Sequence, residues 1–456
     1  MRVVIFGAGN TYQQYRDAFR MMEIVSFVDN DEKKWGSFLD GCPVVSPAEI
    51  VNLQFDYIFL VSIYHAAIRK QLLDMGIPQD KIIGKEHQLF FDNLVVTENY
   101  TFPRDMQAKE EKKRILLISH TLDLTGAPVV LCRLAQVLKH NGYEVTVYAE
   151  KKSNYGNLLY QLLQEGISVS FFGNLETIKA EDIEEEFDLF WVNTIVLYHV
   201  VEKLLPLGKK VYWWLHETDD SYKEIAAYAN CLQAENLYVF AVGWMAAAFY
   251  EKYAQQKITK NLLYGIPDFE EENSKIPKGK DKIRFGLVGT YGEIKGQDIL
   301  YEVIARNYNE WKDTAEFLFV GRMPEAVQKE FEKLSNIHCM GEVSPERLVD
   351  IYERIDVLIC PSRFDSMPVV VSEAMQHRKV CLVTDKVGQS RYIADGVNGL
   401  VCKAENEDEL TEKIRWILEH PEELARIGEA SYGIFEDNFS MKVFEKNVLE
   451  VIEEDV

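Results

Sequence analysis

Short apolar runs rich in Val, Ile, Leu and Phe alternate with stretches of helical periodicity along almost the whole chain. Apolar runs bounded by turn residues are typical of buried strands, and the stretches between them are typical of helices that cover those strands. The alternation predicts an α/β fold built from parallel sheets.

Two polar passages divide the alternation into three series. They read TENYTFPRDMQAKEEKK and YGIPDFEEENSKIPKGKDK, and both are rich in charge and in residues that favour turns. We therefore expect a small first domain over residues 1–95, a linker over 96–113, and two larger domains over 114–270 and 271–456. The last helix of the chain is expected to belong to the final domain or to pack back on the 114–270 domain.

The expected strands follow the same three series. They are RVVIF, EIVSFV and DYIFLV in the first, RILLIS, YEVTVY, SVSFF, DLFWV, KVYWWL and LYVFAV in the second, and IRFGLVG, EFLFVG, NIHCMG, DVLIC, KVCLV and GLVC in the third. Ligands of such sheets bind at the carboxyl ends of the strands, in the loops that lead into helices. Functional residues are therefore expected in those loops.

Composition limits the class of protein. Hydrophobic residues make up 47% of the 456 residues and charged residues 27%, as in ordinary soluble globular proteins. The stretch MRVVIFGAGN lacks the features of a signal peptide, and no apolar run reaches the roughly 18 residues of a membrane span. The seven cysteines are scattered and lie mostly in apolar runs, as reduced core thiols do. A cytoplasmic protein is expected, and peripheral association with the inner face of the membrane or with a synthesis complex stays open.

The formal net charge of −23 argues against nucleic acid as a partner, because phosphate binding requires a basic face. Residues 403–456 carry 6 Lys and Arg against 16 Asp and Glu, on what are expected to be surface helices. The acidic excess is therefore interpreted as a solvated face.

The loop after the first strand of the third series has the composition of a phosphate site. In LVGTYGEIKGQDIL, over residues 287–300, three glycines and Lys295 stand between a strand and a helix. Exposed backbone N–H groups, a helix N-terminus and an ammonium group together bind phosphate. The alternative interpretation of Lys295 is a solvated side chain on a loop.

The stretch PSRFDSMPVVVSEAM, over residues 361–375, carries one acid before a buried helix and one within it. Pro368 is expected in the first turn of that helix, with Ser366 or Asp365 as its cap, and the backbone N–H groups nearby would face an anionic ligand. Glu373 is placed to accept hydrogen bonds from a diol, and Asp365 to reach a second hydroxyl-bearing group beyond the phosphates. The alternatives are a plain helix cap for Asp365 and a surface position for Glu373.

These motifs together resemble the large GT4 family of retaining glycosyltransferases, whose GT-B fold has two Rossmann-like lobes facing a cleft. The resemblance covers residues 114–456 and rests on TGAPVVLCRLAQVLKHNGYEVTVY, WWLHE, LVGTYGEIKGQDIL, PSRFDSMPVVVSEAM and GVNGLV, in the order of the family. The E-x7-E signature of the family corresponds here to Asp365-x7-Glu373. The 114–270 domain would then be the acceptor lobe and the 271–456 domain the donor-binding lobe.

The resemblance implies a role for each residue of the donor-lobe motifs. Lys295 would hold the diphosphate of the donor, Glu373 its ribose hydroxyls, and Asp365 the transferred sugar. Backbone N–H groups near Ser366 and Met367 would lie at the phosphates.

Two further residues and two departures from the family pattern follow from the resemblance. Gly126 would approach the diphosphate from the first lobe, and His216 would lie near the sugar or the acceptor. A histidine after a strand is as readily a structural residue held by hydrogen bonds. Thr290 stands where many family members have an arginine, which removes a positive charge from the phosphate site, and Asp365 is one methylene shorter than the usual glutamate.

The activity implied by the resemblance is transfer of a hexosyl group from a nucleotide diphosphate sugar to a hydroxyl of a glycan, glycolipid or glycoprotein, with retention of configuration. Lys295, Asp365 and His216 are the candidate catalytic residues, and the lysine and the helix N-terminus would stabilise charge on the leaving diphosphate. The transfer requires no metal and no cofactor. Such an enzyme would serve surface polysaccharide synthesis. The alternative is a catalytically silent protein of the same fold that binds a partner or glycan and assists another transferase.

The first domain carries part of a dinucleotide-binding pattern. Gly7 and Gly9 follow the first strand, and Asp29 ends the second strand, 22 residues after Gly7. Tyr12 occupies the place of the third glycine and is expected to keep the following helix from approaching closely. The domain resembles small nucleotide-binding domains fused to sugar-transfer and sugar-modifying enzymes, and a binding or interaction module is favoured over an NAD-dependent redox domain. The stretch DND matches a metal motif over too few residues to indicate a metal site.

Overall fold

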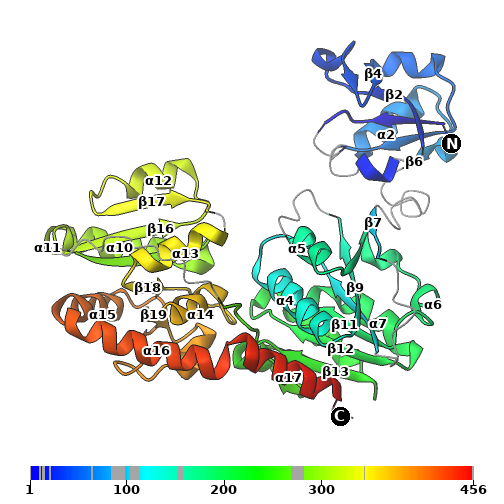
Figure 1. Cartoon of the computed structure of the whole chain (residues 1–456). Coiled ribbons are helices and arrows are strands. Elements are labelled where there is room, and N and C mark those ends of the chain that lie inside the picture. The colour runs from blue at the N-terminus through cyan, green and yellow to red at the C-terminus, as the bar shows by residue number, and fades with distance from the viewer. Residues whose placement is uncertain are drawn as a thin grey trace. The chain divides into compact units, whose positions relative to one another are not determined.

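Three sheets with flanking helices make up the described part of the protein, of which Figure 1 shows a computed structural model. The chain divides into two compact units, one formed by Met1–Asn193 and Leu197–Val211 and the other by Thr194–Val196 and Tyr212–Val456. The structure describes residues 2–9, 12, 16–19, 22–62, 65–83, 98–102, 113–151, 158–268, 282–343 and 345–453.

The first sheet contains six strands in the order β3-β4-β2-β1-β5-β6. Its pairs are parallel apart from the short β3–β4 pair. Apolar side chains form a separate core on each face, because neighbouring residues of a strand point in opposite directions. The strands are β1 (Arg2–Phe6), β2 (Glu23–Val28), β3 (Phe38–Leu39), β4 (Cys42–Val45), β5 (Tyr57–Leu60) and β6 (Ile82–Ile83).

The second sheet contains eight strands in the order β14-β13-β12-β11-β8-β9-β10-β7. Strands β8 and β11 are buried along nearly their whole length, as expected where helices cover both faces, whereas β9 alternates buried and partly buried positions. The strands are β7 (Glu98–Tyr100), β8 (Arg114–Ser119), β9 (Glu144–Glu150), β10 (Ser168–Phe172), β11 (Leu189–Asn193), β12 (Lys210–Leu215), β13 (Leu237–Ala241) and β14 (Lys260–Asn261).

The third sheet contains six parallel strands in the order β17-β16-β15-β18-β19-β20. The strand order reverses between β15 and β18, so the loops after these two strands lead away to opposite sides. This is the place where open α/β sheets leave a crevice for ligands. The strands are β15 (Ile283–Val288), β16 (Ala315–Val320), β17 (Ile337–Gly341), β18 (Val357–Cys360), β19 (Val380–Thr384) and β20 (Leu400–Cys402).

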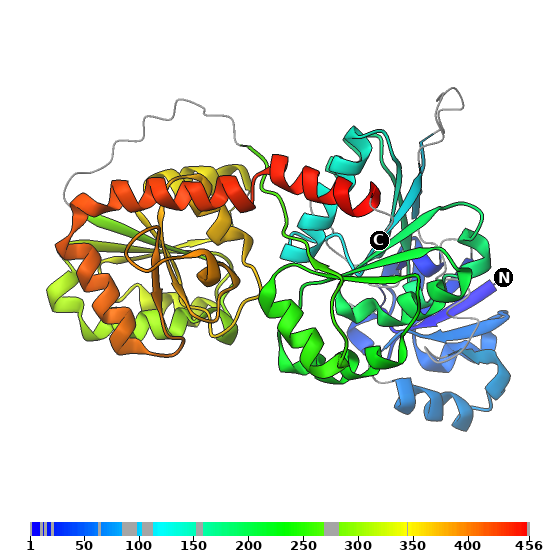
Figure 2. The same cartoon turned by 90° about the horizontal axis from the view of Figure 1, so that it is seen from below.

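Helices cover the sheets, and Figure 2 shows the third sheet lying between helices on both of its faces. Helices α14 and α16 pack against β19, and α10 packs against α15. The helices are α2 (His65–Asp74), α4 (Gly126–His140), α5 (Leu158–Gln164), α6 (Ala180–Ile183), α7 (Tyr198–Leu204), α8 (Lys223–Tyr228), α9 (Trp244–Ala254), α10 (Gln297–Arg306), α11 (Tyr308–Trp311), α12 (Glu325–Phe331), α13 (Pro345–Arg354), α14 (Val369–Gln376), α15 (Glu407–Glu419), α16 (Leu424–Asn438) and α17 (Met441–Glu453).

Helix α17 packs against β12 of the second sheet. The hydroxyl of Tyr212 donates to the carbonyl of Val451 at 3.0 Å, and the ring of Trp214 stacks on Phe444 with 6.1 Å between centroids. The last helix of the chain thus contacts residues of the 114–270 segment.

The predicted α/β architecture of mostly parallel sheets is confirmed. Each strand expected from an apolar run is present, and its ends lie within two residues of the expected ones. The linker expected over 96–113 contains a strand, because Glu98–Tyr100 form β7 and pair antiparallel with β10. The polar triplet ENY carries no apolar signal, so its pairing depends on the open edge of β10.

Candidate functional site

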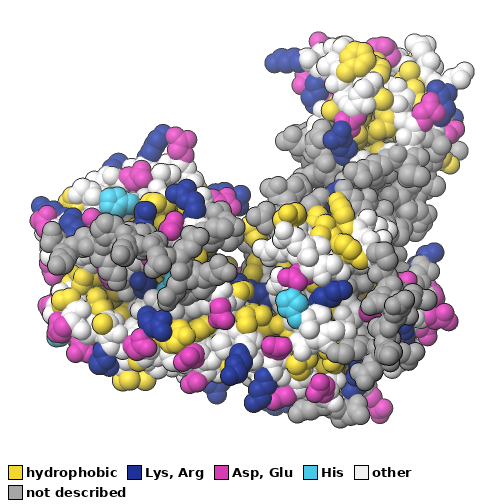
Figure 3. Space-filling model, in the orientation of Figure 1, with side chains coloured by type: hydrophobic (Ala, Val, Ile, Leu, Met, Phe, Trp, Pro, Cys, Tyr) yellow, Lys and Arg dark blue, Asp and Glu magenta, His cyan; other side chains and the backbone are white. Residues whose placement is uncertain are grey.

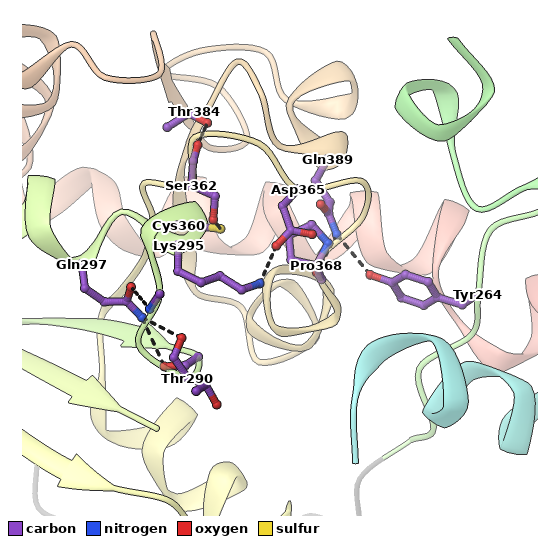
Figure 4. Close-up of polar contacts among 12 residues, drawn as sticks. Tyr264, Thr290, Lys295, Gln297, Cys360, Ser362, Asp365, Pro368, Thr384 and Gln389 are labelled. Atoms are coloured by element: carbon purple, nitrogen blue, oxygen red, sulfur yellow. Dashed lines mark hydrogen bonds and ion pairs between the residues drawn. The ribbon is translucent and has the colours of Figure 1, made fainter. Parts of the chain in front are cut away.

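The loop between β15 and α10 places Lys295 at the carboxyl edge of the third sheet, at the end of the 3-10 turn Glu293–Lys295. The buried amide of Gln297 donates to the carbonyl oxygens of Gly289 and Thr290, at 3.3 and 3.2 Å (Figure 4). The side chain of Thr290 itself is exposed. One side chain from the first turn of α10 therefore holds the loop that carries Lys295.

The loop after β18 brings Asp365 to the same edge. Its backbone is braced by the segment after β19, because Asp365 donates its N–H to Lys386 at 2.8 Å and accepts that of Gly388 at 3.0 Å. The hydroxyl of Thr384 donates to the carbonyl of the buried Ser362 at 2.7 Å (Figure 4). The position of Asp365 is thus set by the end of β19 and by the segment that follows it.

Lys295 and Asp365 form an ion pair where the strand order reverses. The Nζ of Lys295 lies 2.6 Å from Oδ2 of Asp365 (Figure 4), and the two side chains are 38% and 15% exposed. Burial lowers the pKa of Lys295, but the carboxylate outweighs burial and holds that pKa above its ordinary value. The structure therefore brings together the two residues that the sequence predicted for the diphosphate and the sugar.

Close backbone approach and an arginine hold the two loops together. Gly296 has a φ of 69°, and a Cβ on it would lie 2.2 Å from the carbonyl oxygen of Pro361, so glycine is required there. The guanidinium of Arg363 donates to both carboxylate oxygens of Asp298, at 3.0 and 2.7 Å, and its backbone N–H donates to Ile294 at 2.8 Å. Arg363, a residue of the PSRFDSMPVVVSEAM stretch for which no role was predicted, therefore fastens the β18–α14 loop to the β15–α10 loop and to the start of α10.

Helix α14 starts without a side-chain cap. Pro368 is its N-cap residue, with φ −62° and ψ 122°, and no side chain accepts a capping hydrogen bond there. The prediction that Ser366 or Asp365 caps this helix is wrong, since the carboxylate of Asp365 binds Lys295 instead. Met367 is buried and Ser366 partly buried just before the helix.

A buried polar cluster supports the first turns of α14. The Nε2 group of Gln389 donates to the hydroxyl oxygens of Tyr264 and Ser372, both at 3.1 Å, and to the carbonyl of Pro368 at 2.8 Å (Figure 4). Tyr264, Ser372 and Gln389 are all buried. The start of the helix is therefore fixed from its packed side.

Glu373 lies in the second turn of α14 and is partly buried. Its Oε2 atom accepts a hydrogen bond of 2.8 Å from the hydroxyl of Tyr352 on α13. The plain surface position considered for Glu373 does not fit this arrangement. Nothing in the sequence motifs pointed to Tyr352.

His216 follows β12, and its ring packs 4.9 Å from that of Trp214 between centroids. The side chain of Glu217 accepts the backbone N–H groups of Ile195 and His216, both at 3.0 Å. Burial raises the pKa of the Glu217 carboxyl even though these hydrogen bonds oppose the shift. Glu217, visible in the sequence only as the last letter of WWLHE, therefore fixes the backbone at His216.

Gly126 begins α4, in the other compact unit. A Cβ built on Gly126 would meet no described atom within 4 Å. The buried side chain of Asn193 donates to the carbonyl of Ala127 at 2.9 Å and ties the start of α4 to the end of β11. The approach of Gly126 to a diphosphate stays a prediction.

In the first domain the glycine turn and Asp29 lie together. Gly7 has a φ of 120°, and a Cβ on Gly9 would lie 3.7 Å from Nζ of Lys34. Asp29 accepts from the backbone N–H of Ala8 at 2.9 Å and from Lys34 at 2.8 Å. Burial raises the pKa of Asp29, but these donors outweigh burial and lower that pKa below its ordinary value. A ribose at Asp29 would therefore compete with Lys34.

Tyr12, in the place of a third glycine, is 1% exposed in the core of the first domain, and its hydroxyl donates to Asp40 at 2.6 Å. In the DND stretch the backbone N–H of Asp31 donates to Asp29 at 2.9 Å. Among the described residues no group of His, Cys, Asp or Glu is arranged to hold a metal ion.

Acidic and basic side chains are intermixed on the face shown in Figure 3. That arrangement differs from the continuous basic surface with which proteins bind nucleic acid. Within the described ranges, no helix combines the length and the hydropathy that crossing a membrane requires.

Two glycosyltransferase families match successive parts of the chain. Residues 111–263 match the family described as Glycosyl-transferase family 4, and residues 268–433 match Glycosyl transferases group 1. The chain belongs to the GT4-like glycosyltransferases. Residues 1–83 of this glycosyltransferase match a further family, described as C2185-like, N-terminal. Lys295, Asp365 and Glu373 all fall within the group 1 match.

Curated relatives align with parts of the glycosyltransferase. The uncharacterized glycosyltransferase MJ1178 of Methanocaldococcus jannaschii is 27% identical over 205 residues, 44% of this chain and 58% of the relative. The N,N'-diacetylbacillosaminyl-diphospho-undecaprenol alpha-1,3-N-acetylgalactosaminyltransferase of Campylobacter jejuni is 32% identical over 111 residues, 24% and 29% of the two chains. The alpha-D-kanosaminyltransferase of Streptomyces kanamyceticus is 23% identical over 184 residues, 37% and 47%. The chain thus spans less than two thirds of the length of these relatives.

Solved structures establish the GT-B fold of the glycosyltransferase. Anabaena Alr3699/HepE in complex with UDP and glucose superposes with a TM-score of 0.63 at 17% identity, over 75% of this chain and 100% of that chain. WaaG, a glycosyltransferase involved in lipopolysaccharide biosynthesis, superposes with a TM-score of 0.57 at 16% identity, over 75% and 100%.

Proposed function

We propose that this glycosyltransferase is an active retaining enzyme that moves a hexosyl group from a nucleotide diphosphate sugar to a hydroxyl of a glycan, glycolipid or glycoprotein in surface polysaccharide synthesis. The observation that carries the proposal is the convergence of Lys295 and Asp365 where the strand order of the third sheet reverses. A cation, a carboxylate and the start of α14 are the groups that a diphosphate joined to a sugar requires.

Each proposed residue has a chemical task in this reaction. Lys295, with backbone N–H groups near Ser366 and Met367, neutralises charge on the leaving diphosphate. Asp365 binds the transferred sugar, and Glu373 binds the ribose. The acceptor attacks on the face that the diphosphate leaves, and a phosphate oxygen takes its proton, so configuration is retained without an enzyme nucleophile or a metal.

Gly126 and His216 complete the proposed site from the acceptor lobe. Gly126 leaves room for the diphosphate, and His216 lies near the sugar or the acceptor. The UDP and glucose bound to HepE support a nucleotide diphosphate sugar as donor, and the Campylobacter jejuni relative, named for a diphospho-undecaprenol acceptor, supports a glycoconjugate as acceptor.

A catalytically silent protein that assists another transferase is the second candidate, and the observation on its side is that the ammonium group of Lys295 is already paired. A donor diphosphate must compete with Asp365 for the ammonium group, since the pair is in direct contact at 2.6 Å. Thr290 adds no positive charge where many family members have an arginine.

Thermal unfolding in the presence of UDP, GDP, dTDP, ADP or NAD tests the proposal on the full chain. A nucleotide at 100 times its Kd should add about 2.7 kcal/mol of stability. We expect one nucleoside diphosphate to raise the Tm of the wild type but not that of Lys295→Ala. The matched control is Lys329→Ala, which removes an exposed lysine that pairs with Glu325 on its own helix.

Turnover then separates the two candidates. Release of nucleoside diphosphate from the corresponding nucleotide sugar, lost in Lys295→Ala and Glu373→Ala, supports the active enzyme. Binding without turnover in the presence of glycan acceptors supports the silent protein. If no nucleoside diphosphate stabilises the wild type, the donor site itself is wrong.

A further inference from the structure

We propose that Tyr352 is a positioning residue that orients the carboxylate of Glu373 toward the ribose hydroxyls of the donor nucleotide. The inference rests on the donor site proposed above and names a residue that acts through Glu373 rather than on the substrate. It follows from a single buried hydroxyl on α13.

The ring of Tyr352 is held on two sides. Its side chain is 2% exposed, and its ring stacks on that of His377 with 5.2 Å between centroids and 25° between planes. The hydroxyl donates to Oε2 of Glu373 at 2.8 Å. Because the ring cannot turn without losing its packing, the hydroxyl points at the carboxylate in a fixed direction.

Packing alone does not explain why the ring at position 352 carries a hydroxyl group. Phenylalanine would fill the same space, whereas a buried hydroxyl is favourable only where it finds a hydrogen-bond partner. Here that partner is a carboxylate, and a hydrogen bond to a charged acceptor is stronger than one between neutral groups. The observed bond therefore fixes the rotamer of Glu373.

Fixing that rotamer matters for ligand binding. Burying a glutamate side chain in one rotamer costs up to about 2 kcal/mol of conformational entropy, and a ligand that meets a pre-oriented side chain avoids much of this cost. The first turns of α14, which carry Glu373, are already held, because the carbonyl of Pro368 and the side-chain hydroxyl of Ser372 both accept hydrogen bonds from Gln389. Tyr352 restricts the remaining freedom, that of the side chain.

The donor role of Tyr352 does not change with pH in the physiological range. Burial, together with the neighbouring Glu373 carboxylate, raises the pKa of Tyr352 well above its ordinary value. The phenol therefore stays protonated and can only donate to the carboxylate.

The test compares nucleotides with and without the ribose diol. Dissociation constants of UDP, GDP and ADP and of their 2′,3′-dideoxy forms are measured by calorimetry on wild type, Tyr352→Phe and Tyr308→Phe. The last is the matched control, since the hydroxyl of Tyr308 bonds with Ser335 on the same lobe, away from Glu373. In the wild type we expect the Kd of the dideoxy form to exceed that of the ribonucleotide by about 10-fold or more. In Tyr352→Phe this ratio should fall to about 3-fold or less, because a hydrogen bond to a charged group is lost. The control should keep the full preference.

The possible results separate the inference from the function on which it rests. If the wild type binds none of the nucleotides, the donor site is wrong and the inference falls with it. If Tyr352→Phe keeps the wild-type preference, or weakens both forms equally, Tyr352 is a structural residue and the inference is overturned. If Tyr352→Phe does not fold, Glu373→Gln must lose the same preference, and a retained preference in that variant overturns the inference as well.

Discussion

His377, the residue that follows α14, stacks its ring on that of Tyr352. Burial lowers the pKa of His377 from its ordinary 6.5 to about 4. Between these two values the unfolded chain binds a proton that the folded protein does not. The stability that the neutral ring contributes is therefore present above about pH 6.5 and is lost as the pH falls toward 4.

Replacing this histidine should weaken the response of stability to acid. Between pH 7 and pH 5 the wild type should lose about 2 kcal/mol of unfolding free energy through His377 alone. The unfolding free energy of His377→Asn, measured by urea unfolding at the two pH values, should fall by about 2 kcal/mol less than that of the wild type. His338→Asn, which replaces an exposed histidine on β17, is the control and should follow the wild type. Equal pH responses in wild type and His377→Asn would contradict the prediction.

The two loops that carry Lys295 and Asp365 meet because one of them passes directly over the end of β18. Gly296 makes this possible, since its positive φ and its closeness to Pro361 both exclude a side chain. In the same loop Gly292 has an extended backbone, with a φ of −177°, and a Cβ on it would meet no described atom within 4 Å. The loop thus contains a glycine that the geometry requires and one that it does not.

The two glycines form a matched pair for a test of the loop geometry. Gly296→Ala should lower the unfolding free energy by about 1–3 kcal/mol, because alanine is strained at positive φ and collides with a carbonyl. It should also lose most of the Tm increase caused by the nucleoside diphosphate that binds the wild type. Gly292→Ala should change either quantity little. Thermal unfolding with and without nucleotide measures both, and similar behaviour of the two variants would show that the close approach does not position Lys295.

The boundary between the first domain and the rest of the chain involves the edge of the second sheet. Strand β7 covers β10 there, the rings of Tyr100 and Phe171 lie 6.5 Å apart, and the N–H of Phe102 donates to the hydroxyl of Ser168 at 3.1 Å. An uncovered edge strand exposes unpaired N–H and C=O groups to other chains. Residues within the linker expected from the sequence therefore complete the second sheet.

Truncated chains test this arrangement. A chain that starts at residue 98 keeps β7, whereas a chain that starts at residue 113 exposes β10. We expect the shorter chain to have the lower Tm and to aggregate more, as measured by thermal unfolding and size-exclusion chromatography. If the two chains have the same Tm and aggregate to the same extent, β7 does not stabilise the sheet, and the domain can be taken to begin after residue 113.

Much of the fold could be predicted because its signals are local. A strand buried on both faces must be apolar along its length, so β8, β11, β18 and β19 are visible as continuous apolar runs. The alternation of such runs with helices predicts parallel sheets, and the carboxyl ends of the strands predict where a site lies. Two of the candidate site residues, Lys295 and Asp365, lie in such loops, and Glu373 lies in the helix after the second loop. The order of residues along the chain was therefore enough to select them as candidates.

The contacts between distant segments could not be predicted in this way. The ion pair of Lys295 with Asp365 joins residues 70 positions apart, and the bond from Tyr352 to Glu373 joins two helices that flank a strand. Arg363 reads in the sequence as one more loop residue, although it binds both loops of the site. Such partners depend on the three-dimensional arrangement of strands and on the space between them, and periodicity and spacing carry no information on either. The chain order therefore specifies which residues are available, and packing decides which of them meet.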